Sequence, residues 1–109
     1  YENTTAALDS WRSIAVLLMM SKRRVLIDSS AQHIAAALGL PSMVLWIGTS
    51  SKVFGYEMHA NVDASTPDKE INLDHMYYQR LPLFEDISKC PYTELNKIFD
   101  AKDLIKNLI

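Results

Sequence analysis

The sequence VLIDSSAQHIAAALGLPSMVLWI, residues 25–47, contains the pattern that predicts the fold. Its two apolar ends, Val25–Ile27 and residues 43–47, hold β-branched and aromatic residues and predict buried strands. Between them, residues 30–38 follow helical spacing, and Gly39 stands where a left-handed residue often ends a helix. A strand, a helix and a strand in this order predict a βαβ unit with parallel strands and a right-handed crossover.

Helical spacing also predicts a helix on each side of this unit. The first covers about residues 10–20, with Asp9 or Ser10 as its N-cap, and the second begins after Asp100. Each of the three helices carries apolar residues that we expect to be buried: Trp11, Ile14, Ala15 and Leu18 in the first, Ala31, Ile34, Ala35 and Leu38 in the middle one, and Ala101, Leu104, Ile105 and Leu108 in the last. Trp46, in the second strand, is also predicted to lie in the core.

Length and composition restrict the class of protein. The chain has 109 residues, 49% of them hydrophobic, which fits one domain with its own core. A net charge of −2 argues against a general nucleic-acid binder. One cysteine and three widely spaced histidines give no disulfide framework and no metal-ligand pattern, so we expect no metal and no cofactor. The longest apolar run, residues 14–20, is too short for a membrane span, so we expect a cytoplasmic protein.

The strand count suggests an incomplete domain. Residues 61–64 predict a third, short strand, and residues 65–90 are expected to be mostly loop. Continuously apolar strands are typical of a parallel sheet that is covered on both faces. Nucleotide-binding domains of this class usually have five or six strands, so the chain is predicted to be part of a larger α/β domain.

Polar residues stand where the first two strands end. Asp28, Ser29 and Ser30 join the first strand to its helix, and residues 48–51 form the loop after the second strand. Open α/β sheets bind ligands at this edge, and a helix N-terminus attracts anions such as a diphosphate. His33, about one helical turn further on, is within reach of the same ligand. In the alternative interpretation, these residues only cap the helix.

Three stretches resemble glycosyltransferase family 9, the lipopolysaccharide heptosyltransferases. They are IDSSAQHIAAALGLP at residues 27–41, LWIGTS at residues 45–50 and the pair Gly55-Tyr56. Members of the family carry an Asp-Ser/Thr-Gly-x-x-His-x-Ala-Ala-Ala-x-Gly-x-Pro signature, then a strand and a loop that leads to a similar pair. The resemblance covers about residues 10–60. It implies a GT-B enzyme, in which two Rossmann-like domains face a cleft, and a partial Rossmann-like α/β/α arrangement for this chain.

The resemblance also implies a role. Residues 1–109 would be a single domain, the later part of the donor-binding domain, without the N-terminal acceptor domain that holds the catalytic base; no catalytic residue is therefore expected here. The implied donor-binding residues are Asp28, Ser29, Ser30, His33, Gly48 and Thr49, with Lys52 and Tyr56 as further candidates. The complete enzyme would move a sugar from a nucleotide-diphosphate sugar to a glycan or lipopolysaccharide acceptor. It would need no metal, and would work in the bacterial cytoplasm or peripherally at the inner membrane.

Two alternatives remain open. Ser30 stands where the family usually has glycine, and Ser51 stands where a proline often follows the loop. A side chain at position 30 hinders the backbone from coming close to a bound phosphate. This difference favours a non-catalytic α/β ligand-binding or interaction module. The second alternative is a fragment of a nucleotide-sugar epimerase, whose GT-B-like domain also places Asp-Ser turns at a helix start.

Overall fold

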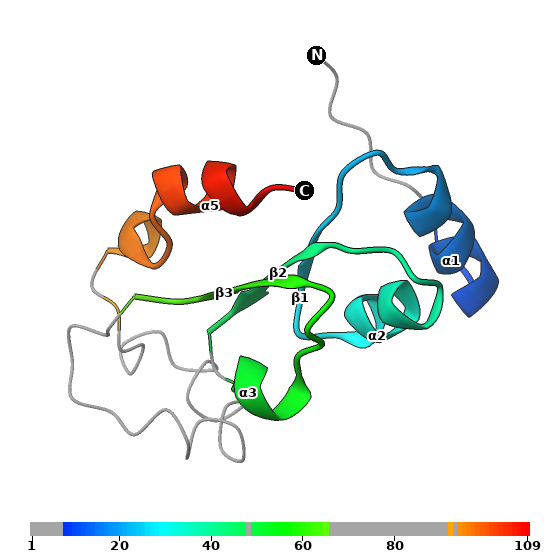
Figure 1. The fold of residues 1–109 in the computed structure, drawn as a ribbon, viewed down its shortest axis with the longest axis horizontal. Coiled ribbons are helices and arrows are strands. Elements are labelled where there is room, and N and C mark those ends of the chain that lie inside the picture. The colour runs from blue at the N-terminus through cyan, green and yellow to red at the C-terminus, as the bar shows by residue number, and fades with distance from the viewer. Residues whose placement is uncertain (1–7, 48, 66–91, 93) are drawn as a thin grey trace.

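Three short strands pair in parallel in the computed structural model, which describes residues 8–47, 49–65, 92 and 94–109. The sheet has the order β1-β2-β3, with β1 at Val25–Ile27, β2 at Met43–Trp46 and β3 at Ala60–Asp63 (Figure 1). The helices are α1 (Trp11–Met20), α2 (Ser30–Ala37), α3 (Ser51–Phe54) and α5 (Ala101–Asn107), with a 3-10 turn, η2, at Leu95–Lys97. The predicted α/β class and the third strand are confirmed, whereas most of the predicted loop over 65–90 lies outside the described residues.

The βαβ unit forms as predicted, and its helix ends at the predicted glycine. Gly39 has φ +70°, a conformation that glycine adopts without steric strain. The amide of Leu40 donates to the carbonyl of Ala35 at 2.9 Å, and the amide of Gly39 donates to the carbonyl of Ala36 at 3.0 Å. These two bonds close the Schellman motif and satisfy carbonyls at the end of α2. The chain then enters β2, which lies directly beside β1.

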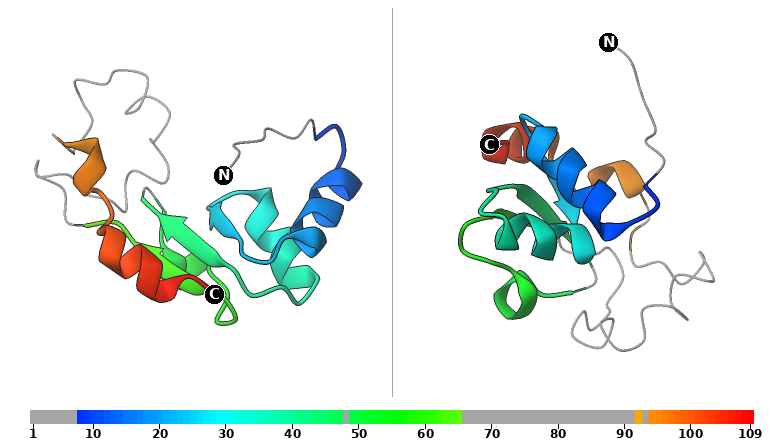
Figure 2. Two further views of the ribbon diagram at one scale, coloured as in Figure 1. Left: turned by 90° about the horizontal axis from the view of Figure 1, so that it is seen from above. Right: turned by 90° about the vertical axis from the view of Figure 1, so that its right-hand side faces the viewer.

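Helices lie on both sides of the sheet. Figure 2 shows α1 and α2 together on one side and α5 on the other. Because successive side chains of a strand point to opposite faces, Val44 and Trp46 share one face of β2 and Met43 lies on the other. All three are buried, as expected for the central strand of the sheet. The predicted burial of Trp46 is thus confirmed.

The prediction that β1 is a buried strand is wrong. The side chains of Val25 and Ile27 are 53% and 61% exposed. Val25 is in register with Met43 and Ile27 with Leu45, so the two exposed side chains lie on the same face of the sheet as Met43. Helix α5 packs against β3, at the opposite edge of the sheet. β1 is therefore an edge strand with one uncovered apolar face.

Several residues of the predicted helical stripes are also exposed. Leu18 and Ala35 are buried as predicted, and Ile14, Ala15, Ala31, Ile34 and Leu104 are half-buried. The residues that were predicted to be buried but are exposed are Trp11, Leu38, Ala101, Ile105 and Leu108. The main packing partner of α1 is α2, and that of α5 is β3. Each helix therefore covers only a narrow part of the core, and the remainder of its apolar stripe faces solvent.

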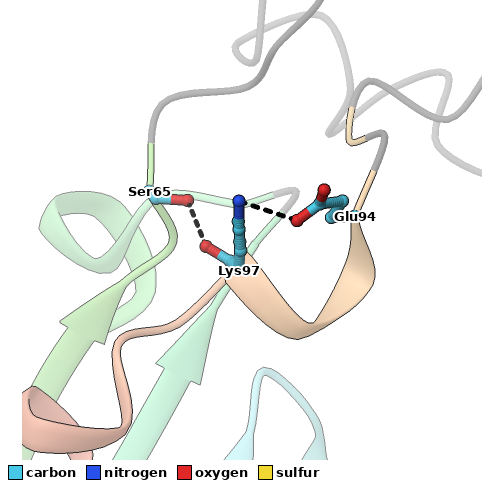
Figure 3. Close-up of polar contacts among 3 residues, drawn as sticks. All are labelled: Ser65, Glu94 and Lys97. Carbon is cyan, nitrogen blue, oxygen red and sulfur yellow. Dashed lines mark hydrogen bonds and ion pairs between the residues drawn. The ribbon is translucent and has the colours of Figure 1, made fainter.

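The C-terminal helices are tied to the end of β3 through Ser65. Its amide donates to the carbonyl of Ile98 at 2.7 Å, and its hydroxyl donates to the carbonyl of Lys97 at 2.9 Å (Figure 3). The hydroxyl of Tyr92 donates to the Ser65 carbonyl at 3.0 Å. Lys97 also forms an exposed ion pair with Glu94, with 2.8 Å between Nζ and Oε2. Tyr92 and Ile98 also belong to a small apolar cluster, which is completed by Ile47, Ala64 and Phe99.

Candidate functional site

The turn after β1 and the loop after β2 leave the sheet at the same edge. β1 and β2 are parallel neighbours, and Ile27 is in register with Leu45 near their carboxyl ends. Residues 28–29 then lead into α2, and residues 47–50 lead into α3. This confirms the predicted placement of the two segments. Thr49 is half-buried in the second segment, and Gly48 lies outside the described residues.

The N-terminus of α2 has no side-chain cap. Ser29 occupies the N-cap position in an extended conformation, but its hydroxyl accepts no hydrogen bond from the helix. Ser50, the N-cap of α3, also makes no side-chain cap bond. By contrast, the Ser10 hydroxyl accepts from the Ser13 amide in α1, and the Asp100 carboxylate accepts from the Lys102 amide in α5.

The side chains of Asp28, Ser29 and Ser30 make no hydrogen bond with any described residue. Residues 28–30 therefore do not cap α2 through their side chains. In the first turn the N–H of Gln32 donates to the Ser29 carbonyl at 3.3 Å. The N–H groups of Ser30 and Ala31 have no side-chain acceptor among the described residues, so these two need a partner from solvent or a ligand.

His33 is joined to Tyr56, 23 residues further along the chain. Its Nδ1 lies 2.9 Å from the Tyr56 hydroxyl oxygen, and the two rings meet edge to face with centroids 5.6 Å apart. Both side chains are partly exposed to solvent. The structure thus brings two of the predicted site residues together, one from α2 and one from the segment between α3 and β3.

Gln32 is a buried member of this cluster that the sequence analysis missed. Its side chain is 0% exposed. The amide nitrogen Nε2 donates to the Phe54 carbonyl at 3.3 Å and lies 3.4 Å from Nε2 of His33. The other amide atom, Oε1, is buried without a hydrogen-bond partner among the described residues. The available signal was its spacing of three from Ala35, which places both residues on the same face of α2.

His59 is a buried link between α2 and the start of β2. Its side chain is 5% exposed. Nδ1 accepts a hydrogen bond from the Ser42 amide at 3.1 Å, and Nε2 donates to the Gln32 carbonyl at 3.0 Å. One ring nitrogen accepts and the other donates, so these partners fix the neutral Nε2–H tautomer. His59 therefore has a structural role, and its ring also meets that of Tyr56 edge to face at 5.9 Å.

The segment that carries Tyr56 is held against β3. A Cβ atom at Gly55 would collide with the carbonyl oxygen of Ser51 and lie 3.2 Å from Oδ1 of Asn61, so only glycine fits there. The Asn61 amide nitrogen donates to the Tyr56 carbonyl at 3.0 Å, and its oxygen accepts from the Trp46 indole at 3.0 Å. These contacts give the Gly-Tyr pair a fixed position.

The remaining candidates differ in their availability to a ligand. Lys52 is exposed on α3, close to the loop after β2, and has no hydrogen bond or ion pair with a described residue. Ser51 donates to the Asp63 carboxylate at 3.0 Å, which ties the start of α3 to the end of β3. Lys52 is therefore the one of these two side chains that is free to approach a ligand.

Arg24 is at the opposite end of β1 and serves the fold. Its guanidinium donates to the carbonyls of Leu18, Ser21 and Pro41 at 3.2, 2.6 and 3.0 Å and to the Ser42 hydroxyl at 3.1 Å. It thereby joins the end of α1 to the segment before β2. A guanidinium with this many protein acceptors has few donors left for a ligand.

Comparisons with protein-family models, with curated proteins and with solved structures give no match. In the part of the chain that the structure describes, no group of three or more His, Cys, Asp or Glu residues is placed to hold a metal ion. No helix among these residues is long and apolar enough to cross a membrane.

Proposed function

We propose that this chain is the donor-binding portion of a sugar transferase that resembles glycosyltransferase family 9 and uses a nucleotide-diphosphate sugar. The observation that carries the proposal is the uncapped N-terminus of α2, at the sheet edge where the turn after β1 meets the loop after β2. The βαβ unit and the positions of Asp28, Ser29 and His33 match the family signature in order and spacing.

The proposed site suits a diphosphate for electrostatic reasons. A helix N-terminus carries a partial positive charge and several N–H donors, so it stabilises an anion without a metal. The hydroxyls of Ser29 and Ser30 can add donors, since no described residue uses them. In sugar transfer the diphosphate departs with growing negative charge, so donors already in position lower the barrier. A carboxylate only accepts when ionised, so Asp28 would bind a hydroxyl group of the donor rather than its phosphates.

The proposal includes the finer fold. We infer that β1-α2-β2-α3-β3 is part of a larger Rossmann-like sheet, with further strands beside β1. The exposed side chains of Val25 and Ile27 support this, because an apolar edge strand is a natural pairing surface. The acceptor domain and the catalytic base would lie outside residues 1–109. Such an enzyme would act in the bacterial cytoplasm, on a glycan or lipopolysaccharide acceptor.

A titration of the ¹⁵N-labelled chain with UDP, ADP, GDP and CDP tests the site. We expect at least one of them to shift the amide signals of Ser29, Ser30 and His33. The variant Ser30→Asp places a negative charge in the first turn of α2, where it favours the helix but repels a diphosphate. Ala101→Asp adds the same charge at the first turn of α5 and is the matched control. We expect about a tenfold loss of affinity in the first variant and no change in the second.

Two outcomes would contradict the proposal. In one, no nucleoside diphosphate shifts the three amides at millimolar concentration. In the other, the two aspartate variants weaken binding equally, which would indicate a general charge effect rather than a site at α2. Ser30→Gly tests the non-catalytic alternative, which the serine favours. Tighter diphosphate binding in this variant would show that Ser30 weakens a site of the family's kind, and that result would support the alternative.

A further inference from the structure

The side chain of Gln32 holds the end of α3. Its Nε2 donates to the carbonyl of Phe54, the last residue of α3, at 3.3 Å. The last carbonyls of a helix have no partner within the helix, so Gln32 supplies one from α2. Helix α3 depends on such support, because it has four residues, none of them buried, and its N-cap residue Ser50 makes no side-chain cap bond. A single helical turn is unstable without contacts to other elements.

This contact leaves one atom of the Gln32 amide unsatisfied. Oε1 is buried and has no hydrogen-bond partner among the described residues. The two contacts of Nε2, to the Phe54 carbonyl and to Nε2 of His33, are long at 3.3 and 3.4 Å. Turning the amide over would not help, because Oε1 would then face the Phe54 carbonyl oxygen, and both atoms only accept. The observed position of Gln32 therefore carries the free-energy cost of a buried acceptor without a donor.

The first turn of α2 itself offers a donor for Oε1. Residues 29–32, Ser-Ser-Ala-Gln, have the sequence of a capping box, in which a serine N-cap and a glutamine three residues later bond to each other's backbone amides. Ser29 already has the extended backbone of an N-cap residue, with φ −155° and ψ 179°. Its hydroxyl makes no capping bond, and the Gln32 amide donates instead to the Ser29 carbonyl at 3.3 Å. Rotation of the two side chains would complete the box.

We propose that Gln32 is a switch between two helix ends. In the structure it holds the last carbonyl of α3. In a second, less populated state Oε1 accepts from the Ser29 amide, the Ser29 hydroxyl accepts from the Gln32 amide, and α3 is released. The states exclude each other, because the orientation that reaches Phe54 leaves Oε1 without a donor and so does not reach the Ser29 amide. This inference does not depend on the proposed function, since no ligand takes part.

The free energies of the two states are expected to be close. Each state satisfies groups that the other leaves unpaired: the Phe54 carbonyl in the first, and Oε1 of Gln32 with the Ser29 amide in the second. A state that lies only slightly higher in free energy is populated to a measurable degree. The element that changes is α3, which has the fewest contacts of its own to lose.

Hydrogen exchange of the α3 amides, measured by NMR on the full chain, tests the switch. The amides of Phe54 and Gly55 donate to carbonyls one turn earlier, so their exchange reports how often α3 is released. Ser29→Ala removes an acceptor that the second state needs, and we expect exchange at both amides to slow about fivefold. Ser10→Ala removes a serine cap from α1 and is the matched control, which should leave α3 unchanged.

Gln32→Glu tests the switch from the opposite direction. A carboxylate cannot donate to the Phe54 carbonyl, but it accepts from the Ser29 amide and suits a helix N-terminus. We expect about tenfold faster exchange at Phe54 and Gly55, together with slower exchange at the Ser29 amide. Gln32→Met can form neither bond, so it should speed exchange in α3 without protecting the Ser29 amide. In that variant Ser29→Ala should have no further effect on α3.

Two results would overturn the proposal. In the first, Ser29→Ala leaves the exchange of Phe54 and Gly55 unchanged or speeds it, which would mean that Gln32 supports α3 in a single state. In the second, Gln32→Glu speeds exchange in α3 without protecting the Ser29 amide. Ser29→Ala removes no side-chain bond to a described residue, so it preserves the fold and decides the question even if Gln32→Glu does not fold.

Discussion

Replacing His59 measures how strongly one buried side chain holds α2 to the sheet. His59→Ala removes both the acceptor for the Ser42 amide and the donor to the Gln32 carbonyl. Two further variants separate these bonds. In His59→Asn the new side-chain oxygen lies near the position of Nδ1 and keeps the first bond. In His59→Gln the new NH₂ group lies near the position of Nε2 and keeps the second.

The expected magnitudes follow from burial. His59 is 5% exposed, so water cannot easily replace it as a partner. Each backbone group that loses its partner destabilises the fold by about 1–3 kcal/mol. His59→Asn and His59→Gln should therefore each lower the free energy of unfolding by about 1–3 kcal/mol. His59→Ala loses both bonds and leaves a cavity, so its loss should be about 3–6 kcal/mol, a large part of the 5–15 kcal/mol typical of a domain.

Urea denaturation followed by tryptophan fluorescence is the assay. Trp46 is buried and changes its surroundings on unfolding, whereas Trp11 is exposed in the folded state, so the signal reports mainly the sheet. The control is His33→Ala, which removes an exposed histidine from α2 and should change stability by less than about 1 kcal/mol. The reasoning is refuted if His59→Ala is no more destabilising than this control. It is also refuted if His59→Asn and His59→Gln are each as unstable as His59→Ala.

Three further variants can be measured in the same denaturation assay. Gly55→Ala should destabilise the fold by about 1–3 kcal/mol because its Cβ meets a backbone carbonyl; a neutral effect would show that the segment can shift. Arg24→Lys should lose about 1–3 kcal/mol because an ammonium cannot reproduce four guanidinium bonds, while Arg23→Lys, at an exposed neighbour, should change little. Ser29→Ala should cost less than about 0.5 kcal/mol and Ser10→Ala about 1 kcal/mol; equal losses would mean that Ser29 caps α2 in solution.

The βαβ unit was predictable because its signals are local. Apolar runs, turn residues and Gly39 are each read within a few positions of sequence, and each agrees with the structure. Burial was less predictable, because it depends on neighbours that are distant in sequence. Val25 and Met43 are both apolar and lie in register, yet Val25 is at the edge of the sheet and Met43 at its centre. Nothing within either strand distinguishes these two positions.

The candidate site was predictable to a similar degree. The edge of the sheet followed from topology, because parallel neighbours end on the same side. The pairing of His33 with Tyr56 did not follow, because it depends on how the segment after α3 returns to α2. The burial of Gln32 was missed because glutamine is mostly exposed in proteins, and its side chain here is retained by a carbonyl from another element.

At the edge of the sheet where β1 and β2 end, residues that hold α2 and the Tyr56 segment in place lie close to hydrogen-bond donors that no described residue uses. This combination argues for ligand binding rather than for stability alone. His59 fixes α2 through the Gln32 carbonyl, and Asn61 fixes the segment of Tyr56. Ser29 does not cap α2 as Ser10 caps α1, and Ser50, in the loop after β2, likewise leaves α3 without a side-chain cap. A side-chain cap stabilises a fold by about 1 kcal/mol, so without the Ser29 cap the free energy of unfolding is lower by about that amount. A bound anion would recover it, because it would take the place of the cap on the same N–H groups.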